Sequence, residues 1–176
     1  MSGFFGYTRA RSKHKSVEWY TPAWIFERLG VTFDIDPCSP HDMESHVPAR
    51  VKYTVFDDGL KQAWSGCVWM NPPYGRSTPF WMRRFIDHAN GIALVFSRTD
   101  ALWCQEALRT ADACLFIAGR IDFVPGKENQ HKRARAGAGT VMFAYGDFCA
   151  DALAKLSDRG VFLRRARHSA NLLEAA

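Results

Sequence analysis

Four consecutive residues near the middle of the chain, Asn71-Pro72-Pro73-Tyr74, combine groups that can hold and activate an amine. An amine attached to an aromatic ring is a poor nucleophile because its lone pair is delocalised into the ring. Two acceptors that engage its two N–H bonds favour a more pyramidal nitrogen and stabilise the charge that develops on it. The side-chain oxygen of Asn71 and the carbonyl of Pro72 are such acceptors. We therefore predict catalytic roles for these four residues, called the tetrad below.

The prolines and the tyrosine of the tetrad have separate parts in this prediction. The two prolines lack N–H donors and stiffen the backbone, which leaves carbonyl oxygens free to face a ligand. Tyr74 offers an aromatic face to a nucleic-acid base, and such stacking is worth about 1–3 kcal/mol per base. A base inside a duplex must first be flipped out of the stack, and stacking on Tyr74 would offset part of that cost.

Apolar strands that alternate with helices place the tetrad in the chain. This alternation is typical of an α/β fold with a mostly parallel sheet and helices on both faces. Ligands of such sheets bind at the carboxyl ends of the strands, and the tetrad directly follows a buried strand. The predicted strands are 31–35, 51–56, 67–70, 92–97, 113–118 and 140–145, with an extended run at 121–124, and the predicted helices are 22–29, 79–88, 100–109 and 148–156.

Residues typical of helix ends mark two of these helices. We predict Thr21 as the N-cap of the first helix, Pro22 at its first helical position and Gly30 at its end. Asp147 is the predicted cap of the last helix.

Composition indicates an ordinary globular chain. Of its 176 residues, 47% are hydrophobic and 23% charged, which fits a single domain over residues 17–176. Residues 1–16 are predicted to form a flexible basic arm, either a solvated tail or an arm that contacts DNA. The net charge of +5 is compatible with a nucleic-acid partner.

Cysteine usage and hydropathy predict a cytoplasmic protein. Five cysteines, with no Cys-x-x-Cys spacing, indicate reduced thiols rather than a disulfide framework. We expect no membrane association, because the N-terminus has no apolar signal core and no apolar run approaches the roughly 20 residues that span a bilayer. We also expect no metal, because Cys38, His41 and His46 lack a fourth ligand and match no common zinc spacing.

Six short segments, one of which contains the tetrad, follow one another in a characteristic order along residues 18–145. They are Glu18–Pro22, Phe33–Ser39, Asp57–Leu60 with Trp64, Val68–Gly75, Ser97–Asp100 with Trp103, and Gly119–Phe123. As an ordered set they resemble the small phage-type DNA adenine methyltransferase (Dam-like) family. The resemblance implies a Rossmann-like methyltransferase core that moves a methyl group from S-adenosylmethionine to the N6 amine of a flipped adenine in DNA, at a specific site.

The resemblance also implies a donor site. Thr21 and Pro22 would lie near the methionine end of the donor, where a helix N-terminus attracts a carboxylate, although Thr21 could equally be a plain cap. Asp36 could bind a ribose hydroxyl or the donor's ammonium. Asp58 could accept from the donor's adenine amine or be a surface turn residue. The turn after the strand at 31–35 contains no glycine, as in the small phage family. The implied donor-binding residues are Tyr20, Thr21, Pro22, Asp36, Pro37, Cys38, Asp58 and Asn71.

Basic residues predict where DNA binds. Phosphate contacts would make the affinity depend on salt, while a solvated loop is the alternative for the basic residues between the strands at 121–124 and 140–145. Arg98 could instead pair with Asp100. The predicted contacts are Arg98, Arg120, Lys127, Lys132, Arg133 and Arg135, with His131 on the same loop.

Two other functions stay open at this point. The same tetrad can hold an amide, so the chain could methylate RNA or a protein glutamine. It could also be a DNA-binding module with a decayed donor site. Restriction partnership, defence evasion and regulation all fit as biological roles.

Overall fold

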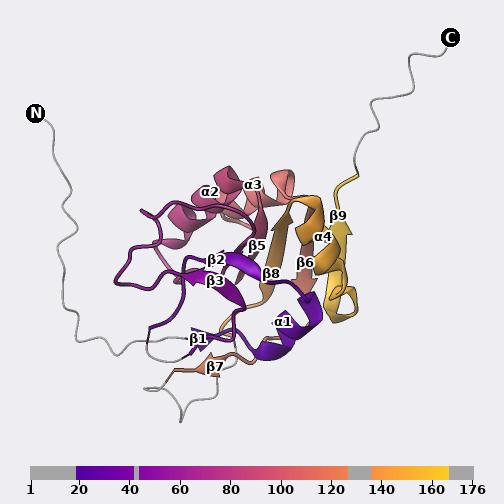
Figure 1. Cartoon of the computed structure of the whole chain (residues 1–176). Coiled ribbons are helices and arrows are strands. Elements are labelled where there is room, and N and C mark those ends of the chain that lie inside the picture. The colour runs from indigo at the N-terminus through magenta and orange to yellow at the C-terminus, as the bar shows by residue number, and fades with distance from the viewer. Residues whose placement is uncertain (1–18, 42–43, 127–135, 167–176) are drawn as a thin grey trace, which may run out of the picture.

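A seven-stranded sheet forms the centre of the computed structural model, which describes residues 19–41, 44–126 and 136–166. The strands lie in the order β3-β2-β4-β5-β8-β6-β9 (Figure 1). Their bounds are β2 (Phe33–Asp36), β3 (Ala49–Lys52), β4 (Val68–Met70), β5 (Gly91–Phe96), β6 (Ala113–Ile117), β8 (Thr140–Tyr145) and β9 (Gly160–Arg164).

The sheet is mixed, which corrects the predicted mostly parallel arrangement. Strands β3, β2, β4 and β5 pair in parallel. Strand β8 lies between β5 and β6 and is antiparallel to both, and β9 is antiparallel to β6. The direction of β8 is not encoded in its apolar sequence, because a strand buried on both faces reads the same in either direction.

Four helices cover both faces of the sheet, as predicted for an α/β fold (Figure 1). One hydrophobic cluster packs α1 (Ala23–Leu29) and α4 (Asp147–Ala154) against the sheet. A second cluster on the other face packs α2 (Thr78–His88) and α3 (Leu102–Thr110). The fully buried Trp69 belongs to the first cluster, and its neighbours Val68 and Met70 belong to the second, as strand alternation requires.

The ends of several elements differ from the prediction. Thr21 does not cap α1, because Pro22 is its N-cap residue and no side chain bonds to the first turn. Likewise Asp147 is the first residue of α4, after the N-cap Gly146. The predicted helix end at Gly30 is confirmed, since this residue is left-handed (φ 61°) and its N–H donates to the Phe26 carbonyl. The N-cap of α1 lies one residue later than predicted and that of α4 one residue earlier, shifts that propensity alone does not resolve.

Two strand predictions also need correction. The strand predicted at 51–56 is β3, which ends at Lys52 because Asp57 accepts from the backbone N–H and hydroxyl of Thr54 and closes a turn. Strand β9, after the short 3-10 helix at Ser157–Arg159, was not predicted. Its apolar residues Val161 and Leu163 are exposed, so it lacks the pattern of a half-buried strand.

A second, two-stranded sheet holds the start of the described chain. Strand β1 (Trp19–Tyr20) is antiparallel to β7 (Val124–Pro125), which continues the predicted extended run at 121–124. This pairing fixes the backbone directly before Thr21.

All five cysteines are free. Cys67 and Cys149 bring β4 and α4 together, with 3.1 Å between their sulfur atoms. Among the described residues no helix is long and apolar enough to cross a membrane, and no group of three or more His, Cys, Asp or Glu could hold a metal.

Candidate active site

Neighbouring parallel strands bring the tetrad and Asp36 to one edge of the sheet. Because β2, β4 and β5 run in the same direction, their carboxyl ends meet there, and we call this the carboxyl edge. Asp36 ends β2, Asn71 directly follows β4, and Phe96 ends β5. This is the edge at which ligands of open α/β sheets bind.

Two hydrogen bonds fix the amide of Asn71. The Tyr74 hydroxyl donates to the Asn71 Oδ1 (2.9 Å), and the Asn71 Nδ2 donates to the Thr21 Oγ1 (3.3 Å). The amide oxygen therefore keeps a lone pair for a further donor. Within the described residues the Pro72 carbonyl accepts no hydrogen bond. The two acceptors predicted from the sequence are thus adjacent and available.

The start of α2 holds the rest of the tetrad. The Thr78 Oγ1 accepts from the backbone N–H of Gly75 (3.0 Å) and donates to the Pro73 carbonyl (3.2 Å). Thr78 is buried, so these bonds lie away from bulk water. They tie the turn after Asn71 to a rigid helix.

Phe96 is a site residue that the sequence analysis missed. Its ring stacks on that of Tyr74, with 3.8 Å between the centroids and 12° between the planes. The signal was present, because Phe96 ends the apolar strand next to the one that carries the tetrad. Phe96 covers one face of Tyr74, so a further ring could stack only on the opposite face. Burial raises the pKa of the Tyr74 hydroxyl far above its ordinary value, so it stays protonated and keeps donating to Asn71.

Asp36 is a buried carboxyl at the same edge. Its side chain is almost inaccessible to solvent, and its Oδ1 accepts from the backbone N–H of Cys38 (3.1 Å). Burial raises the pKa of Asp36 to about 7, and the Cys38 N–H, the charge of Lys52 and a hydrogen bond with Ser39 only partly oppose it. A cationic or hydroxylic ligand group would complete the environment of this carboxylate.

The turn that contains Asp58 packs directly on the turn after Asp36. A side-chain carbon on Gly59 would lie 2.0 Å from the Pro37 carbonyl oxygen, so only glycine fits there. The Trp64 indole N–H donates to the Gly59 carbonyl (2.8 Å) and holds this turn. Asp58 itself is exposed, has a positive φ of 55° and forms an ion pair with Lys61 (2.7 Å).

The structure therefore brings the predicted donor-binding residues together in two groups. Thr21, between the buried Tyr20 and Pro22, meets the tetrad through Asn71. Asp36, Pro37 and the half-buried Cys38 meet Asp58 through Gly59. The two groups are neighbours because β2 and β4 are paired strands.

The predicted DNA-contacting residues have different surroundings. Arg98 is exposed and forms no ion pair with Asp100 in the described part of the chain, so that alternative is not realised. Arg120 donates to the Ala136 carbonyl (2.7 Å) and ties down the end of the basic loop. The remaining predicted contacts, Lys127, His131, Lys132, Arg133 and Arg135, lie outside the described residues.

Comparison with known proteins decides the family. The model of the DNA N-6-adenine-methyltransferase (Dam) family matches residues 9–165. The chain belongs to this family. A DNA N-6-adenine-methyltransferase of Haemophilus phage HP1 (strain HP1c1) is 27% identical over 128 residues, which cover 66% of this chain and 72% of the relative. No solved structure matches.

Membership of the Dam family confirms the resemblance inferred from the ordered segments. It identifies the chain as a DNA adenine methyltransferase, an enzyme class that acts on DNA and uses a methyl donor. The roles of individual residues stay predictions.

Proposed function

We propose that this Dam-family chain transfers a methyl group from S-adenosylmethionine to the N6 amine of an adenine flipped out of DNA. One observation carries the proposal: two available acceptors, the Asn71 Oδ1 and the Pro72 carbonyl, lie beside the Tyr74 ring at the carboxyl edge. A planar amine with two N–H bonds and an aromatic ring matches this arrangement. The parallel half of the sheet and its covering helices support a Rossmann-like core.

The tetrad activates the amine by placing two hydrogen-bond acceptors and one aromatic face around it. Adenine stacks on the face of Tyr74 opposite Phe96, and its two N6–H bonds point to the Asn71 Oδ1 and the Pro72 carbonyl. Hydrogen bonds fix the Asn71 amide, and the stiff backbone of the two prolines holds the Pro72 carbonyl. Both acceptors therefore need little reorganisation as positive charge develops on the nitrogen. The nitrogen–methyl bond forms as the sulfur–methyl bond of the donor breaks, which leaves a neutral thioether, and the methylated nitrogen then loses one proton to water.

Residues at the ends of β2 and β4 fit the donor. S-adenosylmethionine, when bound, supplies an electrophilic methyl group on a sulfonium centre. Asp36 would hold its ammonium or a ribose hydroxyl, and the Gly59–Pro37 contact keeps that side of the site narrow. Tyr20, Thr21, Pro22 and Cys38 would line the methionine end. Lys61 pairs with the Oδ2 of Asp58, and the Oδ1 would accept from the donor's adenine amine.

Positively charged side chains would bind the phosphates of the DNA. The exposed Arg98 and the residues of the basic loop, Lys127, Lys132, Arg133 and Arg135, would contact phosphates, as would Arg120 if it leaves the Ala136 carbonyl. Such contacts position the duplex without reading its sequence.

Labelled methyl transfer tests the proposed function. Unmethylated duplex DNA is incubated with the protein and methyl-labelled S-adenosylmethionine, and the nucleosides are then separated. We expect the label on N6-methyladenine, with less than about a tenth as much transfer to RNA or protein competitors. Label on cytosine, or none on DNA, would contradict the proposal.

An Asn71→Ala variant separates chemistry from donor binding. It removes one acceptor and should lower transfer at least ~100-fold, the usual size of the loss when one preorganised polar group is removed from a reacting centre. Donor affinity by calorimetry should stay within a few-fold of the wild type. Full activity in this variant would refute the role of Asn71.

A further inference from the structure

Two large apolar side chains lie exposed at the starts of α2 and α3. Phe80 is 67% exposed and Leu102 is 87% exposed, the highest value among the large hydrophobic residues. Helix α2 follows β4 and α3 follows β5, and these strands are parallel. Both helices therefore begin at the carboxyl edge, where the tetrad lies.

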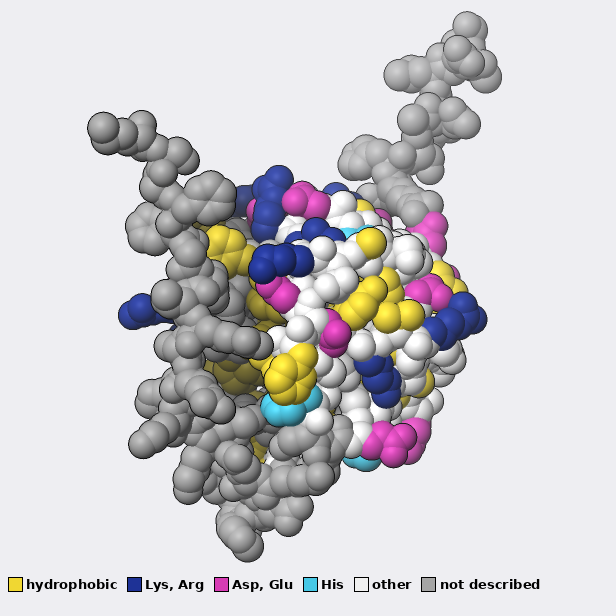
Figure 2. Space-filling model, turned by 60° about the vertical axis from the view of Figure 1, so that its left-hand side comes forward, with side chains coloured by type: hydrophobic (Ala, Val, Ile, Leu, Met, Phe, Trp, Pro, Cys, Tyr) yellow, Lys and Arg dark blue, Asp and Glu magenta, His cyan; other side chains and the backbone are white. Residues whose placement is uncertain are grey.

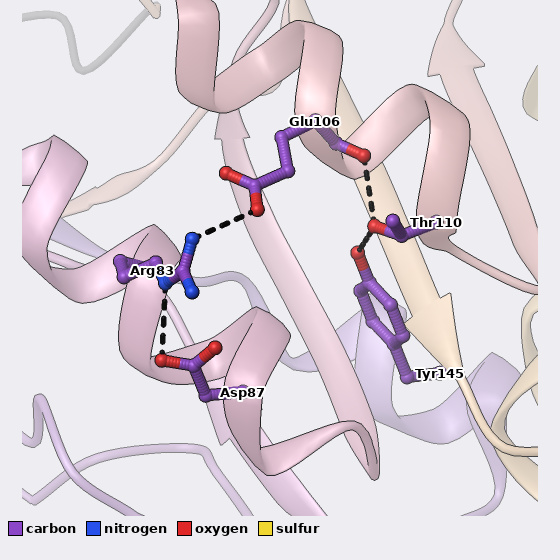
Figure 3. A network of polar contacts seen from close by, with 5 residues as sticks. All are labelled: Arg83, Asp87, Glu106, Thr110 and Tyr145. Carbon is purple, nitrogen blue, oxygen red and sulfur yellow. Dashed lines mark hydrogen bonds and ion pairs between the residues drawn. The ribbon is translucent and has the colours of Figure 1, made fainter.

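An ion pair joins α2 and α3 about one turn beyond Phe80 and Leu102. Arg83 of α2 and Glu106 of α3 are joined at 3.1 Å between Nη1 and Oε1 (Figure 3). Phe80 precedes Arg83 by three residues and Leu102 precedes Glu106 by four, about one helical turn in each case. Because both helices begin at the carboxyl edge and run in the same direction, Phe80 and Leu102 each lie about one turn nearer that edge than this ion pair.

Polar contacts beyond Phe80 and Leu102 connect the two helices. Arg83 also binds Asp87 (3.1 Å), and the Thr110 hydroxyl contacts the Glu106 carbonyl (2.8 Å) and the Tyr145 hydroxyl (Figure 3). The network links α2, α3 and β8. A side chain that must enter another molecule needs such support, since a mobile one would lose more entropy on insertion.

Charges beside the pair suit a polyanion. Arg76 lies between the tetrad and α2, and Arg98 lies between β5 and α3. Both are exposed, and neither guanidinium makes a hydrogen bond or ion pair with another described residue. On the face shown in Figure 2, exposed hydrophobic, basic and acidic side chains are interspersed.

We propose that Phe80 and Leu102 form an apolar wedge that enters duplex DNA where the target adenine has left the stack. Arg76 and Arg98 would contact phosphates beside it. Apolar side chains inserted between base steps are a general means of holding a deformed duplex, because they replace stacking lost from the bases. The wedge rests on the proposed function, since it is needed only if the adenine is flipped out.

Two duplexes that differ at one nucleotide test the wedge. The first carries the sequence methylated in the transfer experiment, with the target adenine opposite thymine. In the second, an abasic nucleotide replaces this thymine, so the adenine has no partner and leaves the stack at lower cost. The kcat/KM of the Phe80→Ala/Leu102→Ala variant is compared with that of the wild type on both. We expect a loss of at least ~10-fold on the paired duplex and of less than ~3-fold on the abasic one, because unstacking costs a few kcal/mol.

A matched control uses apolar residues far from the carboxyl edge. Phe148 is 63% exposed and Leu163 is 52% exposed, at the start of α4 and on β9. The Phe148→Ala/Leu163→Ala variant should match the wild type on both duplexes within ~2-fold, as expected for surface substitutions.

Three results would overturn the wedge: an equal loss on both duplexes, no loss on the paired duplex, or the same loss in the control variant. Each of these leaves adenine methylation by the wild type intact. Failure of the wild type to methylate adenine would instead sink the proposed function itself.

Discussion

The amide of Asn71 is held from two sides. Tyr74 bonds its oxygen and Thr21 bonds its nitrogen, so the group that would accept from the target amine has one orientation. We therefore propose that Thr21 is a positioning residue of the reacting centre, although it does not cap α1. Such preorganisation is where enzymes gain much of their transition-state stabilisation.

A Tyr74→Phe variant separates the hydroxyl from the ring. The ring still stacks on Phe96, but the hydrogen bond to Asn71 is lost. A neutral hydrogen bond is worth about 0.5–1.5 kcal/mol, so kcat should fall roughly 3–10-fold while the KM for DNA changes little. Steady-state kinetics on unmethylated DNA measure both. An unchanged kcat would mean that this bond does not orient the amide.

Asp36 gives the free protein a pH dependence. Its folded pKa of about 7 lies above the ordinary value of 3.8, so the fold favours the protonated carboxyl. The stability that this preference contributes is fully present below about pH 4 and is lost as the pH rises towards 7. An Asp36→Asn variant lacks the titration. Its Tm relative to wild type should therefore be higher at pH 8 than at pH 4.

The same variant tests the donor site. If the ionised Asp36 holds the donor, Asp36→Asn should weaken S-adenosylmethionine binding at pH 8 by at least ~30-fold, the lower end of the loss for a buried charged partner. Calorimetry measures this. An exposed control, Asp100→Asn, should leave donor affinity and the Tm unchanged. Unchanged donor binding in Asp36→Asn would remove Asp36 from the site.

Two turns packed together form the wall behind Asp36. The turn at Asp57–Leu60 has no partner strand, and its place depends on the contact of Gly59 with Pro37 and on the hydrogen bond from Trp64. The donor side of the site is therefore positioned by the packing of two loops, whereas the tetrad directly follows β4 in the sequence.

A Gly59→Ala variant tests this wall. The added carbon would lie 2.0 Å from the Pro37 oxygen, which is backbone and cannot swing away. We expect a stability loss of about 1–3 kcal/mol, as for other overpacked sites, and weaker donor binding. Thermal unfolding and calorimetry measure the two effects. Gly137→Ala is the matched control, because nothing lies within 4 Å of a carbon added there; equal behaviour of both variants would contradict the packing role.

The whole molecule carries a net charge of +5. Affinity for DNA should therefore fall at least ~10-fold between 50 and 200 mM salt, because phosphate contacts release counterions. Fluorescence anisotropy with a labelled duplex measures the slope of log K against log salt. An Arg98→Ala variant should make that slope shallower by about one unit. A slope that does not change with Arg98 would place this residue outside the DNA interface.

The direction of the strands explains why the residues of the site lie at one edge of the sheet. Strands β3, β2, β4, β5 and β6 all run in one direction and end at the carboxyl edge. Asp36 ends β2, Asn71 follows β4 and Phe96 ends β5. The antiparallel β8 turns the start of α4 to the opposite edge, whereas α1, α2 and α3 all begin at the carboxyl edge, the last two with the exposed Phe80 and Leu102.

The sequence by itself determined the tetrad, the α/β class with helices on both faces and the family. Apolar periodicity and an ordered set of short motifs are local properties, so a single chain displays them. Tertiary structure alone decided the reversal of β8, the stacking of Phe96 on Tyr74, the bond from Asn71 to Thr21 and the contact of Gly59 with Pro37. Each of these joins residues more than 20 positions apart or depends on the direction of a buried strand. Such pairings follow from the packing of the whole sheet, which no local pattern in the sequence encodes.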